Sequence, residues 1–251
     1  MRAQPLTRRV VTASVVLLAA SIPGGPALAQ DISINLGQGG GVTERAIQLI
    51  ALLTILSIAP SIVVMMTSFT RIVVVLSLLR TALGTATAPP NAVIIALALF
   101  LTAFVMGPTL QQSYDNGIRP LVANEIGVEQ ALERAGGPLR TFMQKNVREK
   151  DLKLFMDLSG EPPPATPEQM SMRILVPAFM ISELKRAFEI GFLLFLPFLI
   201  IDLVVASVLM SMGMMMLPPV VVSLPFKLIF FVLVDGWTLV AGSLVQSYGG
   251  S

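Results

Sequence analysis

The sequence predicts an all-α integral membrane protein with about four long apolar helices and an amphipathic helical segment. Hydrophobic residues occupy 54% of the 251 positions and charged residues only 13%, whereas about a quarter of an ordinary soluble domain is charged. The stretches 46–70 and 81–114 contain no charged residue. Each is longer than the roughly 20 apolar residues that a helix needs to cross a bilayer. The chain therefore belongs to the membrane class.

The N-terminal segment has the three parts of a secretory signal peptide. The basic pair Arg8-Arg9 precedes a short apolar run, and small residues ending at Ala29 follow a Pro/Gly break. This order predicts a cleavable signal peptide over residues 1–29, with cleavage between Ala29 and Gln30. An uncleaved signal anchor is the alternative. Residues 30–45 are polar and Gly-rich, and we expect a flexible segment there.

Residues 46–110 are predicted to form a first apolar helical hairpin region. Its apolar blocks cover about residues 46–66 and 92–106. Between them lies a largely apolar run of eight residues, 72–79, bracketed by two arginines. Eight residues are too few to span a bilayer, so we expect this run to form a short helix that folds back.

Residues 111–178 form the one strongly charged region. Without the signal peptide the chain has 14 basic and 15 acidic residues, and this region holds 8 and 9 of them. Arg71 and Arg80 are opposed by no acidic residue nearby, so the positive-inside rule places them in the cytoplasm and the charged region in the periplasm. Its apolar residues approximate one face of an amphipathic helix: Leu139, Phe142, Met143, Val147, Leu154 and Phe155.

Residues 179–251 are predicted to form a second apolar helical hairpin with blocks at about 190–209 and 220–245. The helix that leads into this hairpin is predicted to begin at Thr166. Thr166 is a cap residue, Pro167 takes the first helical position, and Gln169 lies three residues after the cap.

The turn of the second hairpin is unusually rich in methionine. Met is flexible and polarizable, so a loop of this kind can repack around different shapes while it stays apolar. That property suits a gasket that closes a pore, and burial of the turn against neighbouring helices is the alternative. The candidate gasket residues are Met210, Met212, Met214, Met215 and Met216.

Three charged residues, Asp202, Lys227 and Asp235, lie within the apolar blocks of this hairpin. Charged groups at such positions face the protein interior or water. Asp202 and Lys227 lie at depths that differ by only about 3 Å along the two helices, so they can pair across the hairpin. A proton relay is the alternative, although the chain has no histidine. Glu183 is a further candidate, with Arg148 or Lys227 as its partner within or between subunits.

The composition excludes several kinds of chemistry. The chain has no Cys and no His, so it lacks thiol and imidazole groups and most transition-metal ligands. Neither a phosphate-binding loop nor a nucleophile with a neighbouring base occurs. We therefore predict no enzyme, no cofactor and no metal site, and the balanced charge of the mature chain gives no reason to expect nucleic acid as a partner.

Two parts of the chain, 65–108 and 175–248, resemble the FliP (SctR) family of type III secretion export-gate subunits. The motifs that carry the resemblance are Thr67-Ser68-Phe69-Thr70-Arg71 with the run that ends at Arg80, Pro89-Pro90-Asn91, Pro177-Ala178-Phe179, Glu183-Leu184-Lys185, Phe188 with Ile190-Gly191-Phe192, Asp202, Met214-Met215-Met216-Leu217-Pro218-Pro219 and Leu224-Pro225-Phe226-Lys227. Residues 125–137 lie outside it.

The resemblance implies a channel-forming subunit of the flagellar export gate that passes unfolded flagellar substrates across the inner membrane. It further implies a ring-like, pentameric homo-oligomer, two smaller FliQ- and FliR-like membrane partners, and the Met-rich loop as the pore gasket. The expected location is the bacterial inner membrane, as a multi-pass protein of the flagellar basal body with a large periplasmic portion. A virulence-type export gate and a secondary transporter are the alternatives.

Overall fold

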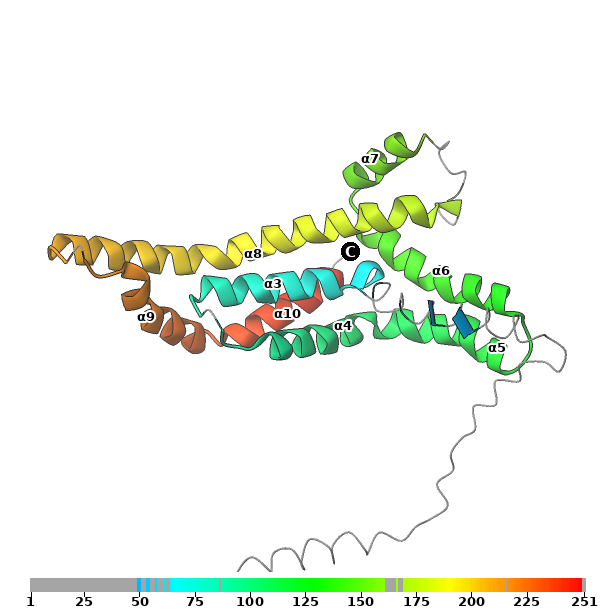
Figure 1. Ribbon diagram of the computed structural model, residues 1–251, viewed down its shortest axis with the longest axis horizontal. Helices are drawn as coiled ribbons and strands as arrows, with labels where there is room; N and C mark the ends of the chain where they lie inside the picture. Colours follow the sequence, from blue (N-terminus) through cyan, green and yellow to red (C-terminus); the bar gives the residue numbers. More distant parts are fainter. Residues whose placement is uncertain are drawn as a thin grey trace, which may run out of the picture. The chain divides into compact units, whose positions relative to one another are not determined.

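The computed structural model describes residues 49–50, 53–54, 57, 61, 64–85, 87–160, 166, 169–214 and 216–249 (Figure 1). The chain divides into two compact units, Met1–Leu52 and Leu53–Ser251, and the description below concerns the second unit. The predicted signal peptide with its cleavage site at Ala29 and Gln30, the 30–45 segment and most of the first apolar block lie outside the described residues.

All regular structure in the described part of the chain is helical, which confirms the all-α prediction. The elements in chain order are α3 (Phe69–Ala82), α4 (Asn91–Ser113), the π-helical turn η1 (Tyr114–Ile118), α5 (Arg119–Val122), α6 (Val128–Asn146), α7 (Glu149–Ser159), α8 (Met172–Ser211), α9 (Pro219–Leu233) and α10 (Gly236–Gly249).

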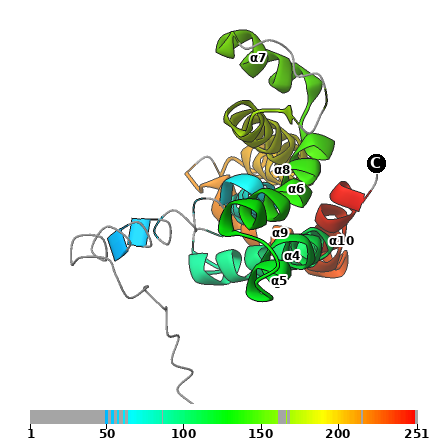
Figure 2. The ribbon, with the colours of Figure 1, turned by 90° about the vertical axis from the view of Figure 1, so that its right-hand side faces the viewer.

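The short helix α3 forms the centre of the main core. It lies between α8 and α4 in both Figure 1 and Figure 2, and its fourteen residues are too few to cross a bilayer. The helix is apolar on nearly every side, which is typical of a helix enclosed by other helices. The core side chains come from five helices: Ile72, Val75, Leu76 and Leu79 of α3, Ile94 and Ala98 of α4, Ala187 and Phe198 of α8, Phe231 of α9, and Val240 and Leu244 of α10.

Gly191 allows α8 to pack closely on α3. A Cβ atom at this position would lie 2.3 Å from Cδ1 of Leu78 and 3.2 Å from its Cβ. A larger residue would therefore push the two helices apart, and the buried surface that holds α3 in place would be reduced.

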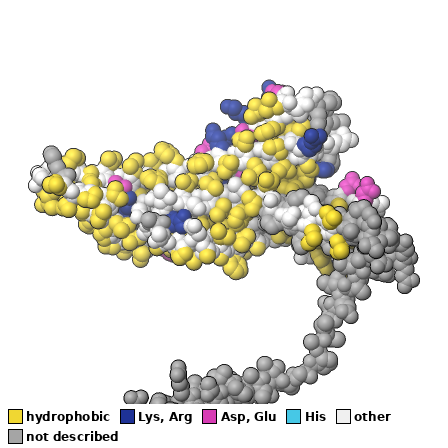
Figure 3. Space-filling view, in the orientation of Figure 1, with side chains coloured by type: hydrophobic (Ala, Val, Ile, Leu, Met, Phe, Trp, Pro, Cys, Tyr) yellow, Lys and Arg dark blue, Asp and Glu magenta, His cyan; other side chains and the backbone are white. Residues whose placement is uncertain are grey.

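Within the described residues, two helical stretches are long and apolar enough to cross a membrane. The first covers Asn91–Val122 and the second, Met172–Ser211, is α8. Hydrophobic side chains cover much of the visible surface along α8 and α9 (Figure 3). Helix α8 continues past residue 178, where a boundary was predicted, and it begins at Met172 rather than at Thr166, with Ser171 as its extended N-cap residue.

The last apolar block is a bent pair of helices. Helices α9 and α10 pass the same length and hydropathy test only when they are taken together, and they meet at an angle of 63°. Asp235 lies at the break with φ of 50°, a left-handed conformation that ends α9. The block predicted at 220–245 is thus two helices.

The charged region also contains a break that was not predicted. Val147 and Arg148 are extended, so the expected apolar face is divided between α6 and α7. Phe142, Met143, Val147 and Phe155 pack with the first turns of α8 in a second apolar cluster. Leu154 is 48% exposed and takes no part in it.

The turn η1 packs against α6 through Gly117. A Cβ atom at Gly117 would lie 2.5 Å from the backbone oxygen of Ala131 and 2.7 Å from the Cβ of Ala135. Backbone atoms cannot rotate out of the way as a long side chain can, so even a methyl group would separate η1 from α6.

We therefore expect Gly117→Ala to lower the free energy of unfolding by about 1–3 kcal/mol. Gly136→Ala in α6 is the matched control, because its Cβ would meet no atom within 4 Å and a helical Gly→Ala change stabilises by about 0.4–1 kcal/mol. Thermal unfolding of the detergent-extracted protein would measure both. Equal midpoints for the two variants would contradict the close contact.

Candidate functional site

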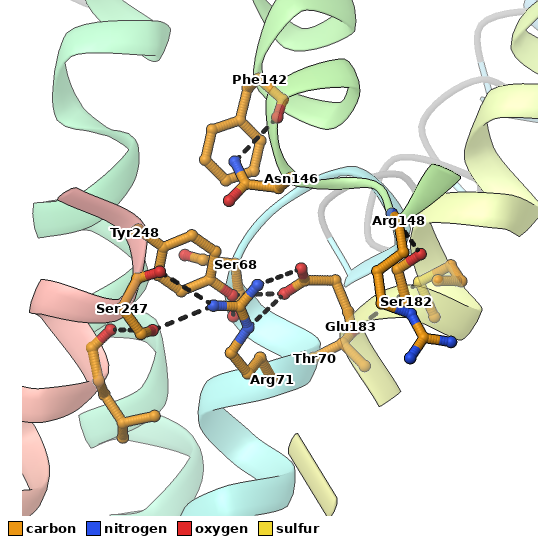
Figure 4. A network of polar contacts seen from close by, with 12 residues as sticks. Ser68, Thr70, Arg71, Phe142, Asn146, Arg148, Ser182, Glu183, Ser247 and Tyr248 are labelled. Carbon is orange, nitrogen blue, oxygen red and sulfur yellow. Dashed lines mark hydrogen bonds and ion pairs between the residues drawn. The ribbon is translucent and has the colours of Figure 1, made fainter. Parts of the chain in front are cut away.

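The central polar feature is a buried ion pair between α3 and α8. Nε of Arg71 donates to Oε2 of Glu183 at 2.9 Å, and Nη2 donates to Oε1 in a bidentate arrangement (Figure 4). The two side chains are 1% and 0% exposed. Paired charge-assisted hydrogen bonds of this kind are stronger than neutral ones and fix the relative orientation of both groups.

Helix α10 completes this network. The Tyr248 hydroxyl donates to Glu183, and the tyrosine ring lies 3.8 Å from the guanidinium carbon of Arg71. Nη1 of Arg71 donates to Oγ of Ser247 at 3.0 Å. The guanidinium is thus satisfied by a carboxylate, a hydroxyl and an aromatic face. Three helices far apart in the sequence meet at one arginine.

The structure contradicts the prediction that no acidic residue opposes Arg71. Arg71 is buried and pairs with Glu183, 112 residues later. The reason is that α3 is enclosed by other helices, so a charge on it must be paired inside the protein. Arg80 lies near the end of α3 and donates to the Pro89 carbonyl and to Asn91.

Arg148 belongs to a neighbouring cluster that docks α7 on α8. Its guanidinium donates to both carboxylate oxygens of Asp151, at 2.8 and 2.9 Å. The Ser182 hydroxyl donates to Asp151 at 2.7 Å and accepts the backbone N–H of Arg148 at 3.0 Å. Within the described chain Glu183 therefore pairs with Arg71, while Arg148 pairs with Asp151.

The Asp151 carboxyl has a lowered pKa. The Arg148 hydrogen bond is the main cause, the Ser182 hydroxyl acts in the same direction, and burial opposes both. The hydrogen bond to Asp151 in turn raises the pKa of Arg148. Both groups are therefore charged near neutral pH.

The structure brings Asp202 and Lys227 together across the second hairpin. Nζ of Lys227 lies 2.6 Å from Oδ2 of Asp202, and the Ser223 hydroxyl donates to Oδ1. Nζ also lies 3.4 Å from the carbonyl oxygen of Ala82, the last residue of α3. A cation at the C-terminal end of a helix is favourable because unpaired carbonyls gather there. Lys227 thus connects α9 to both α8 and α3.

The Met-rich turn follows the end of α8, and the described residues of the chain leave it largely uncovered. Met210, Met212 and Met216 are 58%, 66% and 99% exposed, and Met214 is 39% exposed. Met215 lies outside the described residues. Burial of the turn would require contacts beyond the described part of this chain.

Comparisons with known proteins place these features in one family. A model of the FliP family matches residues 52–244. A flagellar biosynthetic protein FliP from Caulobacter vibrioides is 60% identical over 248 residues, which cover 98% of this chain and 93% of that protein. The chain belongs to the FliP family.

Other members of the FliP family are similar over most of the chain. The Bacillus subtilis (strain 168) protein of the same name is 54% identical over 205 residues, covering 82% of this chain and 93% of that protein. The Agrobacterium fabrum protein is 46% identical over 245 residues, covering 97% and 100%. The FliP family match includes Arg71, Glu183, Asp202, Lys227 and the Met-rich turn.

In this FliP-family chain, Arg71→Ala is expected to lower the free energy of unfolding by about 3–5 kcal/mol, because it leaves Glu183 buried without its partner. The matched control is Lys185→Ala, which removes an exposed pair with Glu189 on the same helix and should cost less than about 1 kcal/mol. Unfolding midpoints in detergent would measure the difference. Similar losses in the two variants would show that the buried pair contributes no more than a surface one.

The Asp151 pair gives a pH dependence of defined sign. Because its native pKa lies below the unfolded value of about 3.9, the carboxylate stabilises α7 above that value, and the stabilisation is lost as the pH falls through the native pKa. Asp151→Asn should lower the protection factors of the α7 amides at neutral pH and flatten the fall of these protection factors on acidification. Hydrogen-exchange mass spectrometry would measure this, with exposed Asp157→Asn as the control. A wild-type pH profile in the Asp151 variant would contradict the assignment.

Proposed function

We propose that this chain is a channel-forming subunit of the flagellar type III protein export gate, through which unfolded flagellar substrates cross the inner membrane. The relatives described above are all named flagellar biosynthetic protein FliP, which favours the flagellar assignment over a virulence-type gate. The proposal assigns a structural and transport role without catalysis.

The observation that carries the proposal is the exposed methionine turn. A turn of flexible apolar side chains that its own chain leaves uncovered is costly in water, since each buried aliphatic side chain of this size gains about 1.5–3 kcal/mol. The cost is removed when copies of the turn pack against one another. In a ring of subunits, such turns form a deformable apolar constriction that excludes water and ions.

The proposed assembly is a ring-like homo-oligomer, pentameric by family resemblance, with FliQ- and FliR-like partners. Such an assembly would cover apolar side chains that α8 and α9 expose in the single chain, among them Phe192, Leu203 and Val232. The exposed faces suit lipid and neighbouring helices alike. The proposed location is the inner membrane, with the charged region 111–178 in the periplasm.

The geometry of Lys227 does not favour the transporter alternative. A proton or ion relay needs successive titratable groups that exchange their partners. The ammonium already donates to Asp202 and to the Ala82 carbonyl, and the Ser223 hydroxyl donates to the other carboxylate oxygen of Asp202. A role in holding three helices together uses all of these contacts.

The methionine turn supplies the test. Replacement of Met212, Met214, Met215 and Met216 by Ala should let small ions leak several-fold faster across the membrane while the complex still assembles, because the constriction loses apolar volume. The matched control replaces the same residues by Leu, which keeps the side-chain volume and apolar character. The Leu variant should remain as impermeable to ions as the wild type. Conductance across bilayers that contain the purified complex would be measured. An Ala variant as tight as the wild type would overturn the gasket.

A further inference from the structure

A polar cleft lies between α4, η1 and α6, and Tyr248 of the buried Arg71 network forms part of its lining. Its volume is about 820 Å³. One wall carries Arg134, Thr141 and Lys145 of α6, and the other carries Thr109 and Gln112 of α4. Phe142 and Tyr248, which are in stacked contact, also line it. The cleft therefore combines cationic, amide, hydroxyl and aromatic groups.

The cleft has a positive balance of charge. Asp115 is its one acidic lining residue, and it accepts from Nε2 of Gln111 at 2.9 Å and lies 4.0 Å from Arg119. Neither Arg134 nor Lys145 forms an ion pair within the described residues. These two cations are eleven residues apart, or about 16 Å along α6. That separation is too large for one small anion and fits an elongated acidic ligand.

The opposite side of α6 has the complementary character. At about 100° per residue, Val128, Glu129, Leu132 and Glu133 lie on the side of the helix away from Arg134 and Lys145. Val128 and Leu132 are 64% and 70% exposed, and both glutamates are exposed. We call these four residues the outward face of α6. Figure 3 shows acidic and hydrophobic side chains at the end of the molecule where Figure 1 places this part of α6.

We propose that the outward face of α6 in one copy docks into the cleft between α4 and α6 of a second copy. In this arrangement Glu133 approaches Lys145 of the neighbour, Leu132 covers the aromatic floor, and Glu129, about 6 Å from Glu133 along the helix, lies between Lys145 and Arg134. Exposed apolar residues rimmed by charge mark interaction surfaces, and opposite charges on two such surfaces favour their association. The acidic rim disfavours docking on an anionic membrane surface.

Because the two surfaces lie on opposite sides of one helix, the contact is heterologous. Each copy offers one face to the copy ahead and the other to the copy behind, and such contacts propagate until a ring closes or a helical array forms. The inference deepens the proposed function, since it rests on the assembly of several copies and names the surfaces that join them.

The chain has no cysteine, so disulfide cross-linking gives a direct test. Two differently tagged full-length chains are co-expressed, one with Leu132→Cys and the other with Thr141→Cys, and membranes are oxidised. A cross-link between the two tags is expected. Two chains that both carry Leu132→Cys, or Leu158→Cys with Thr141→Cys, should give at least about tenfold less product. Equal yields in all three pairs, or a cross-link between two Leu132→Cys chains alone, would overturn the proposal.

Charge reversal provides the second measurement. Glu133→Lys alone or Lys145→Glu alone should lower the cross-linked fraction about tenfold, the change expected from one lost interfacial pair, and the double variant should restore it. Lys153→Glu on α7 is the control. The α6 contact would be overturned if the double variant did not restore cross-linking and if all these variants kept the wild-type oligomer mass and ion impermeability. That result would leave the proposed gate standing. A monomeric wild-type protein would overturn the ring itself.

Discussion

Arg71 of α3 sets the main constraint on this structure. A guanidinium enclosed by apolar helices costs several kcal/mol unless a carboxylate and further hydrogen bonds satisfy it. Glu183, Ser247 and Tyr248 supply these groups from α8 and α10. Each contact also requires a particular register between helices. The apolar core around α3 would tolerate small slips along the helix axes, but the bidentate pair would not.

The other polar contacts depend on the same placement of α3. Lys227 reaches the last carbonyl of α3, so α9 follows the position of that helix end. Asp151 and Ser182 lie beside Glu183 and fix α7 against the same turn of α8. Charge within this apolar protein thus specifies which helices meet and in which register, while the apolar side chains supply most of the favourable energy.

Part of this arrangement could be predicted from the sequence. Asp202 and Lys227 are 25 residues apart in one hairpin, so equal depth along two helices was enough to pair them. The partner of Arg71 could not be found in this way, because Glu183 lies 112 residues away and the register of α3 against α8 depends on packing at Gly191. The sequence offered only two signals for this pair: Arg71 lies beside an uncharged run, and Glu183 lies beside an apolar block.

The break at Val147 and Arg148 could not be predicted from the sequence either, because neither glycine nor proline lies at these positions. Its cause is tertiary, because the Arg148 backbone N–H bonds to Ser182 on α8. The exposed outward face of α6 was missed for another reason. Its residues have ordinary helical spacing, and only the packed structure reveals which side of the helix remains uncovered.

Helix α8 connects the charge networks to the methionine turn without a break. At 1.5 Å per residue, Glu183 and Asp202 are about 28 Å apart, and the helix extends about 14 Å beyond Asp202 to its end at Ser211. Pro197 lies between the two contacts and removes one backbone hydrogen bond from the helix. The stretch that ends at the methionine turn is therefore free to bend relative to the stretch that carries Glu183, and the Asp202 contact limits that bend.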